Sequence, residues 1–269
     1  MIVNNYIILG GLPMNNYIIL AGSSKNDVFH YETEKASRDY DLTLFNPNRE
    51  RLSYSNGKTG FISWSLLAGS KDSSYNGLIP GAIKKAGLVC RGSCPCNCEG
   101  CYAKKMTRLP DVYIKTYLNT LEALLDPDKF LELVFNEITR NCENELFIRI
   151  HDQGDFISYK YYCKVMDYCK NHSKWNYGIY TKCESYVYKY GIANIPSNVV
   201  ISCSPWAGHC EPIGDLPQFI YDDHSNPELA TLPHCPAVNK DGKRTGITCR
   251  QCMHCYTARH GDRWAVYSH

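Results

Sequence analysis

Apolar and aromatic runs of strand length alternate with helical stretches from residue 60 onward. The predicted strands occupy residues 61–66, 146–150, 177–180, 199–202, 219–221 and 264–267. A parallel return between two strands needs a crossover long enough to hold a helix, so this alternation favours parallel pairing. The pattern therefore predicts an α/β fold in which six strands form a partial (βα)6 barrel.

Helical periodicity fills the gaps between these strands. One apolar stripe, at steps of three and four residues, consists of Ile114, Tyr117, Leu118, Leu121 and Leu125. Asp126 before Pro127 predicts the start of a second helix, because a capping residue precedes a proline at the first helical position. Ser158 is placed to cap a third helix, and residues 184–190 predict a shorter fourth.

The chain is expected to have three parts. Residues 1–58 form an N-terminal extension, 59–230 the partial barrel, and 231–269 a C-terminal cysteine-rich, cluster-binding segment. The extension contains the hexapeptide Asn-Asn-Tyr-Ile-Ile-Leu twice, at 4–9 and 15–20, with glycines and a proline between the copies. This arrangement predicts a hairpin.

Polar residues follow several of the predicted strands. The strand ending at 150 leads into His-Asp-Gln-Gly-Asp at 151–155, and the strand at 199–202 into Ser-Cys-Ser at 202–204. In barrels of this type the reactive groups lie at the carboxyl ends of the strands. For any single strand end, an ordinary polar loop is the alternative interpretation.

Composition and charge exclude several classes. The 269 residues are 44% hydrophobic and 21% charged with a formal net charge of +2, so the chain is neither disordered nor fibrous. Near-neutral charge gives no global argument for nucleic-acid binding, although a local basic patch stays open. No apolar run approaches the roughly 18 residues of a membrane span. The first Lys is Lys25, so the N-terminus lacks the positive charge with which a secretory signal begins. We expect a soluble, cytoplasmic protein without a membrane partner.

Fifteen cysteines change this picture most. Nine lie in two tight groups, Cys90, Cys94, Cys96, Cys98 and Cys101, then Cys235, Cys249, Cys252 and Cys255. A chain of this length in a reducing compartment does not need disulfides. Thiolates a few residues apart converge readily on one metal centre, and the grouping predicts metal coordination.

The first group contains the spacing C-x3-C-x2-C. Cys94, Cys98 and Cys101 can hold three corners of a four-iron cluster and leave the fourth iron open to a small molecule. An open metal position indicates catalysis, whereas a closed one indicates a structural role. Cys90 or Cys96 as a fourth ligand would give a closed zinc or iron–sulfur site, and redox thiols are a further alternative.

The second group offers four thiols, Cys235, Cys249, Cys252 and Cys255. Four thiolates satisfy either a structural zinc ion or a complete four-iron cluster, and the spacing does not distinguish them. His234 and His254 are adjacent to two of these cysteines and are alternative ligands, although a surface position is the simpler interpretation for each. An iron–sulfur candidate elsewhere in the chain favours a second, auxiliary cluster here.

The C-x3-C-x2-C loop after the first strand, followed by β/α units, resembles the radical SAM superfamily. A longer likeness is to the bacteriophage gene product 88 domain family, over roughly residues 60–256. It rests on Phe-Ile-Ser-Trp-Ser-Leu at 61–66, Cys-Tyr-Ala-Lys at 101–104, Arg-Ile-His-Asp-Gln-Gly-Asp-Phe at 149–156, Tyr-Thr-Lys at 180–182 and Cys-Met-His-Cys-Tyr at 252–256. The phage likeness implies an architecture and a phage or prophage origin, hence the host cell cytoplasm, rather than an activity.

The radical SAM likeness implies a mechanism. An open iron would bind S-adenosylmethionine, and an electron from an electron donor would cleave it to a 5′-deoxyadenosyl radical that takes a hydrogen atom from the substrate. Gly154 and Asp155 match the loop that receives the SAM amino group, and Ser202 and Ser204 match a ribose-contacting position. Gly100, rather than the usual aromatic residue, precedes Cys101. Helix capping is the alternative role for Asp155.

Three functions remain in competition. The first is an iron–sulfur, SAM-dependent radical enzyme with an unknown substrate. The second is a zinc-binding module that interacts with nucleic acid, supported by basic residues near the cysteines: Lys104, Lys105, Arg108, Lys243, Arg244, Arg250, Arg259 and Arg263. These charges would also balance anionic clusters. The third is an iron–sulfur electron carrier or sensor without SAM.

Overall fold

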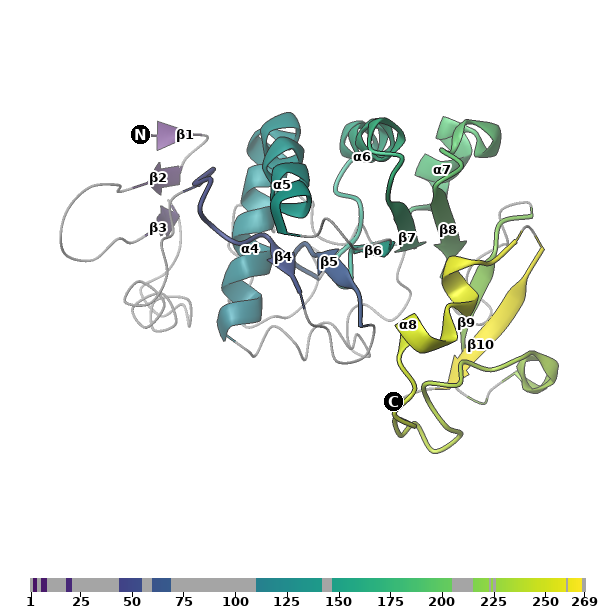
Figure 1. The fold of residues 1–269 in the computed structure, drawn as a ribbon. Coiled ribbons are helices and arrows are strands. Elements are labelled where there is room, and N and C mark those ends of the chain that lie inside the picture. The colour runs from purple at the N-terminus through teal and green to yellow at the C-terminus, as the bar shows by residue number, and fades with distance from the viewer. Residues whose placement is uncertain are drawn as a thin grey trace. The chain divides into compact units, whose positions relative to one another are not determined.

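The computed structural model contains a seven-stranded sheet (Figure 1). The described residues are 2–3, 6–8, 18–20, 44–54, 60–68, 110–141, 147–204, 215–222, 224, 226–259 and 261–267. The strands are β4 (Leu52–Ser53), β5 (Ile62–Trp64), β6 (Phe147–Ile150), β7 (Asn176–Thr181), β8 (Val199–Cys203), β9 (Gln218–Asp222) and β10 (Arg263–Tyr267). Their order is β10-β9-β8-β7-β6-β5-β4, and only β4 among them is antiparallel to its neighbour.

The six strands expected from the sequence all occur, and they pair in parallel as predicted. β4 was not predicted, because two residues are too short to show an alternating pattern. The α/β class is confirmed. The barrel is not confirmed, because the described strands form a sheet with β10 and β4 at its two edges.

Helices occupy the crossovers that the apolar spacing indicated. They are α4 (Pro110–Leu125), α5 (Pro127–Asn141), α6 (Tyr159–Asn171) and α7 (Glu184–Tyr190). Asp126 caps α5 as expected, since its Oδ1 accepts a hydrogen bond from Lys129 N at 3.0 Å. Shorter elements are η1 (Ile192–Asn194), η2 (Pro227–Thr231), α8 (Cys249–Cys252) and η3 (His254–Tyr256).

Three short strands lie near the N-terminus, β1 (Ile2–Val3), β2 (Tyr6–Ile8) and β3 (Ile18–Leu20). β2 and β3 pair antiparallel, with Ile7 opposite Ile19. They come from the two copies of the repeated hexapeptide, so the predicted hairpin pairing is confirmed.

The chain divides into two compact units. Unit 1 comprises Met1–Arg51, Leu66–Leu133 and Gln153–Ser158. Unit 2 comprises Leu52–Ser65, Val134–Asp152 and Tyr159–His269, and it contains the whole seven-stranded sheet. The expected division at residues 58 and 230 stays a prediction.

A buried carboxylate organises part of unit 1. The fully buried Glu122 of α4 pairs with Arg49 (Nη2 to Oε2, 2.7 Å) and Arg51 (Nε to Oε2, 2.8 Å). Asn119, nearly one turn earlier, accepts from Arg49 Nη1 at 3.0 Å and donates to the Arg51 carbonyl at 3.1 Å. A buried charge is costly unless it is paired and hydrogen-bonded, and here both conditions hold. The network joins the segment around residues 45–51 to α4.

The sheet of unit 2 has two different faces. The helix face carries the cross-strand row Trp64, Ile150, Ile179 and Ile201, all at most 2% exposed. Trp64 packs edge-on against Phe135 of α5, with ring centroids 5.9 Å apart. The opposite face, called the cysteine face below, carries Ser63, Arg149, Gly178, Tyr180 and Ser202. This second set includes three polar side chains in addition to a tyrosine and a glycine, although its strands are flanked by neighbours on both sides.

α6 and α7 lie on the helix face of β7 and β8, and the C-terminal segment with α8 lies on the cysteine face (Figure 1). Among the helices in the described ranges, none is long and apolar enough to cross a membrane.

Candidate metal centre

Three of the four cysteines predicted in the C-terminal group lie in one short helical segment, formed by α8 and η3. Thr248 begins α8 with a capping box, in which its Oγ1 accepts from Gln251 N and Gln251 Oε1 accepts from Thr248 N. Met253 ends the helix in the left-handed conformation, with φ 56°, and donates its N–H to the Cys249 carbonyl at 2.7 Å. The 3-10 helix η3 follows directly, so Cys249, Cys252 and Cys255 lie on successive turns of the same short segment.

Cys235 reaches the same region from the edge of the sheet. Its N–H donates to the Ala265 carbonyl at 2.8 Å, and the preceding residue forms a parallel bridge with Ala265 of β10. Cys235 also packs against a small apolar cluster, formed by Ala237, Val238 and Val266. Backbone pairing with β10 therefore sets the position of the fourth thiol.

The four cysteines, called the C-terminal thiol group below, act on one another electrostatically. Burial, together with negative charge on Cys235, Cys249 and Cys252, raises the pKa of the Cys255 thiol to about 12, whereas a hydrogen bond from the Tyr180 hydroxyl opposes the rise. An uncharged Cys255 is therefore expected at neutral pH unless a cation is bound. Zinc ions and iron–sulfur clusters are held by sets of cysteine thiolates of this size. In the parts of the chain that are described, however, no set of three or more His, Cys, Asp or Glu side chains is already arranged to hold a metal ion.

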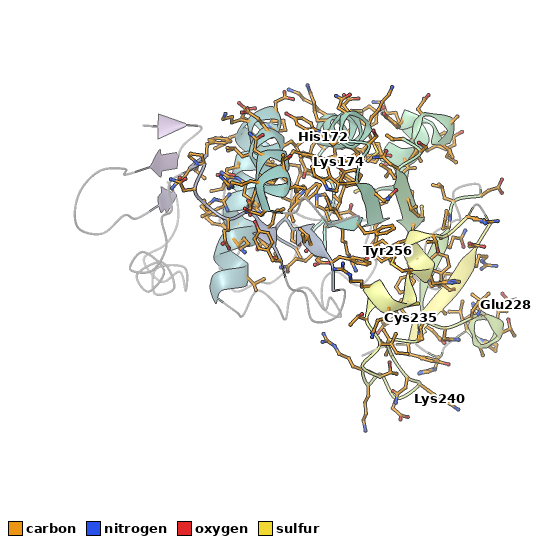
Figure 2. The ribbon with its side chains drawn as sticks, in the orientation of Figure 1. His172, Lys174, Glu228, Cys235, Lys240 and Tyr256 are labelled. Atoms are coloured by element: carbon orange, nitrogen blue, oxygen red, sulfur yellow. The ribbon has the colours of Figure 1, made fainter. Side chains whose placement is uncertain are left out.

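An aromatic contact attaches this segment to the sheet. Tyr256 lies flat against the backbone of Gly178 on β7, so closely that a Cβ added at Gly178 would overlap its ring. The Tyr256 ring also meets Phe61 edge-on at 4.6 Å and Tyr180 at 6.3 Å. Figure 2 labels Tyr256 and Cys235 in this part of the molecule. The absence of a side chain at Gly178 is what allows the cysteine segment to dock on the cysteine face.

A charged network continues from this contact across the cysteine face. The Arg149 guanidinium lies 4.7 Å from the centre of the Tyr180 ring, and its Nε pairs with Asp152 Oδ1 at 2.8 Å. Asp152 Oδ2 accepts a short hydrogen bond, 2.6 Å, from Ser63 Oγ. Burial raises the pKa of Tyr256, and the Arg149 charge opposes that rise. Three adjacent strands thus contribute polar groups beside the C-terminal thiol group.

A buried histidine follows β6 on the side of the helix face. His151 has φ 59°, its ring stacks on Tyr161, and its Nε2 lies 3.2 Å from the Tyr161 hydroxyl. That hydroxyl accepts from Trp64 Nε1 at 3.3 Å and still has its own proton, which it can donate to His151 in the tautomer with an unprotonated Nε2. Burial lowers the pKa of His151 to about 3, which agrees with a neutral ring.

The residues predicted to bind the SAM amino group lie in unit 1. Gly154 has φ +76°, and a Cβ there would stand 2.6 Å from the Leu66 carbonyl oxygen, so only glycine fits. Asp155 is buried and accepts a hydrogen bond from Phe156 N at 2.8 Å through Oδ1. α6 begins only at Tyr159, so Asp155 does not occupy the capping position considered from the sequence.

The two predicted ribose-contacting serines lie in unit 2. Ser202 is buried beside Tyr180 on the cysteine face, and within the described ranges its hydroxyl has no hydrogen-bond partner. Ser204 Oγ accepts from Lys182 Nζ at 3.2 Å, at the carboxyl end of the same pair of strands. Both serines are therefore at a strand end, as predicted, and their ligand stays a prediction.

The first cysteine group, Cys94, Cys98 and Cys101 with Cys90 and Cys96, falls outside the described residues, and so do Lys104, Lys105 and Arg108. The open cluster assigned to the first group therefore stays a prediction.

The two histidines considered as alternative ligands have other contacts. His234 stacks on Tyr267 at 4.0 Å, and its ring nitrogens lie 2.9 Å from the Leu232 carbonyl and 3.0 Å from Asp222 Oδ2. Both nitrogens thus face oxygen acceptors rather than the thiols. His254 is exposed and meets Trp264 edge-on at 5.1 Å. These contacts favour an all-cysteine donor set.

Sequence reasoning did not assign roles to Arg149, Gly178, Tyr180 or Tyr256. One signal was present, because Arg149 stands between two buried isoleucines on β6 and thereby indicates a strand with one polar face. The contact between Tyr256 and Gly178 joins positions far apart in the chain, and no local pattern indicates it.

An open parallel sheet with a thiol-rich C-terminal segment docked on one face defines an α/β protein with a candidate metal centre. More narrowly, the chain belongs to the gene product 88 family, whose sequence model matches residues 48–258. This match confirms the family resemblance seen in the sequence and does not extend to a radical SAM core. No curated protein and no solved structure matches the chain.

Proposed function

We propose that the protein is an iron–sulfur enzyme that uses S-adenosylmethionine for radical chemistry. In this proposal Cys94, Cys98 and Cys101 hold a cluster with an open iron, and the C-terminal thiol group holds an auxiliary cluster. The observation that carries the proposal is the grouping of Cys249, Cys252 and the half-buried Cys255 on one short segment, with Cys235 within electrostatic range, next to a charged sheet face. Thiols that served only as small core residues would not gather in this way.

The strand order gives further support. β5 to β10 are neighbours in the order in which the chain forms them, so their carboxyl ends meet at one edge. Polar residues gather at that edge of unit 2, among them Asp152, Lys182 and Ser204. Enzymes built from successive β/α units place reactive groups at this edge.

The chain's own residues have defined tasks in this proposal. The buried rings of Tyr256 and Phe61 pack edge-on and attach the cysteine segment to the sheet. Tyr180 lies next to Cys255, and Arg149 lies over the Tyr180 ring, so both orient this part of the cysteine face. When bound, the open cluster would supply the electron for reductive cleavage of S-adenosylmethionine.

Anaerobic purification followed by iron, sulfide and zinc analysis tests the proposal. We expect about eight irons per chain, since each cubane holds four. Cys98→Ala is expected to remove about half of the iron, and the neighbouring Cys96→Ala to remove none. Stoichiometric zinc without sulfide would contradict the proposal, and loss of iron in Cys96→Ala would show that the wrong triplet was assigned.

A second candidate is a zinc-binding module that interacts with nucleic acid. It is favoured by four exposed basic residues around the C-terminal thiol group, Lys243, Arg244, Arg259 and Arg263. Arg250 is engaged with the protein, since its Nη1 reaches the Gly60 carbonyl at 3.4 Å. The same metal analysis separates the two candidates. If iron is present, adding S-adenosylmethionine to the reduced protein should perturb its electron paramagnetic resonance spectrum, whereas an electron carrier or sensor without SAM would show no change.

A further inference from the structure

The segment that contains α6 and α7 carries an excess of positive charge. Residues 159–190 include six lysines but only two carboxylates, Asp167 and Glu184, so their net charge is +4, whereas that of the whole chain is +2. The two helices pack together through tyrosine rings, with the Tyr159 and Tyr186 centroids 5.8 Å apart. Their solvent-exposed side is called the α6–α7 surface below. A charge excess confined to one region of a near-neutral chain indicates an anionic partner for that region.

The lysines of this surface lack the acidic partners found on α5. There, Lys129 pairs with Glu132 of the same helix at 3.0 Å. Within the described residues, four exposed lysines of the α6–α7 surface form no ion pair, namely Lys160, Lys170, Lys174 and Lys189. Their charges are therefore available to an external anion.

Two of the four amino groups are held in place by aromatic rings. Lys174 Nζ lies 4.2 Å from the centre of the Trp175 ring, and Lys189 Nζ lies 4.3 Å from the centre of the Tyr159 ring. Figure 2 labels Lys174 in this part of the molecule. A ring attracts a cation without cancelling its charge. These two lysines thus lose less side-chain entropy when they bind an anion than freely moving lysines would.

Tyr188 exposes an aromatic ring beside these charges. Its side chain on α7 is 77% exposed, whereas the other exposed large hydrophobic residues in the described ranges are between 37% and 42% exposed. It directly precedes Lys189 and makes no ring contact within the described residues. An exposed aromatic ring next to lysines is the combination on which the bases and phosphates of a single strand bind.

The apolar side of α6 is already used by the fold. Its buried residues are Tyr161, Tyr162, Val165, Met166 and Cys169. A helix that binds a lipid surface inserts its apolar face between the lipids, and α6 has no such face left. The exposed features favour a polyanion with aromatic groups over a membrane.

We propose that the α6–α7 surface binds single-stranded nucleic acid. Lys160, Lys170, Lys174 and Lys189 contact phosphates, and Tyr188 stacks on a base. Lys160 and Lys170 are about 15 Å apart along a helix with the usual rise, so they contact different phosphates. This surface belongs to the helix face, whereas the basic residues around the C-terminal thiol group belong to the segment on the cysteine face. The inference does not depend on which metal the thiol group binds.

Fluorescence anisotropy of a labelled oligothymidylate, titrated with the full chain at several salt concentrations, tests this inference. Each phosphate contact to a single strand contributes about 0.7 to the slope of log K against log salt concentration, so four lysines predict a slope of about −3. Replacing two of them, Lys160→Gln with Lys170→Gln, should weaken binding at low salt and make the slope shallower by about 1.4.

Tyr188→Ala gives a different signature. Loss of one stacked base should weaken binding about tenfold, and the slope should not change because no charge is removed. An unchanged affinity in Tyr188→Ala would show that no base stacks there and would contradict the single-strand assignment.

The matched control is Lys243→Gln with Arg244→Gln, which removes two charges near the C-terminal thiol group and should change neither the affinity nor the slope. If this control lowers the slope and the α6 pair does not, nucleic acid binds near the thiol group and the inference is wrong. No binding of the oligothymidylate at low salt, or binding only to phosphatidylserine vesicles, would also overturn it. Because none of these outcomes concerns iron or sulfide content, the proposed function is tested separately.

Discussion

The two faces of the central sheet differ although the same strands form both. On β7, Ile179 points to the helix face and is buried among aliphatic neighbours, whereas Tyr180 points to the cysteine face and contacts a guanidinium and a thiol. Hydrophobic burial explains the first face completely. The second face places charge, hydroxyls and an unfilled glycine position inside the molecule, which costs stability unless each group has a partner. The first face therefore stabilises the fold, and under the proposed function the second would face a bound group.

The largest effect is expected on the helix face. Ile179→Ala should lower the free energy of unfolding by about 2–5 kcal/mol, because it leaves a cavity in a row of fully buried side chains. Urea denaturation monitored by circular dichroism measures the loss. Metal content per folded chain should not change. If the variant lost its metal while remaining folded, the two faces would not have separate roles.

The second prediction concerns the docking of the cysteine segment. Gly178→Ala should destabilise the protein by about 1–3 kcal/mol, because the new methyl group overlaps the Tyr256 ring. Without that contact, replacing a strand glycine by alanine would be neutral or stabilising.

A double-mutant cycle isolates the contact at Gly178. In a Tyr256→Ala background, Gly178→Ala should cost little, and the difference gives the coupling energy. Equal costs in both backgrounds would mean that the ring does not lie on Gly178.

The third prediction uses pH. His151 is neutral in the folded protein with a pKa of about 3, whereas its ordinary value is 6.5. Between these values the unfolded chain holds one proton more, so acidification from about pH 6 to pH 4 should lower the free energy of unfolding by about 1.4 kcal/mol per pH unit from this residue.

Comparison with His151→Gln isolates the contribution of His151. The variant should show a shallower pH dependence over the same range, measured by urea denaturation at each pH. Parallel curves for the two proteins would show that the ring is accessible to protons in the folded state.

The smallest change in stability is expected at Ser202. Its buried hydroxyl has no partner within the described ranges, so Ser202→Ala should raise the free energy of unfolding by no more than about 1 kcal/mol. Binding of S-adenosylmethionine by the reconstituted protein, measured by equilibrium dialysis, should weaken. A variant that loses stability and binds normally would assign Ser202 to the fold rather than to a ligand.

Local patterns in the sequence were sufficient to predict β5 to β10 and the helices α4 to α7, but not β4 or the short helices. The stripe around Leu118 became α4, and the Asp126-Pro127 pair marked the start of α5. Each of these signals depends on neighbours within a few residues, and the parallel order then follows from the helical crossovers.

The site depends on contacts between distant residues, and these were not predicted. The cysteine spacing indicated a metal centre but not its neighbours. That Tyr256 would pack on Gly178, or that Tyr180 would reach Cys255, depends on how the C-terminal segment returns across the sheet. The buried ion pairs of Glu122 with Arg49 and Arg51 also join distant residues and were not predicted. Glutamate and arginine are usually exposed, so the sequence alone gives no sign that these three are buried.

X-ray absorption spectroscopy at the iron and zinc edges of the anaerobically purified protein tests the central claim most directly. We predict iron in a sulfur shell with iron neighbours, and a loss of about half of that signal in Cys252→Ala but not in Cys163→Ala, a control on α6 away from the thiol group. Zinc in a shell of four sulfurs, or an iron signal that Cys252→Ala leaves intact, would contradict the account.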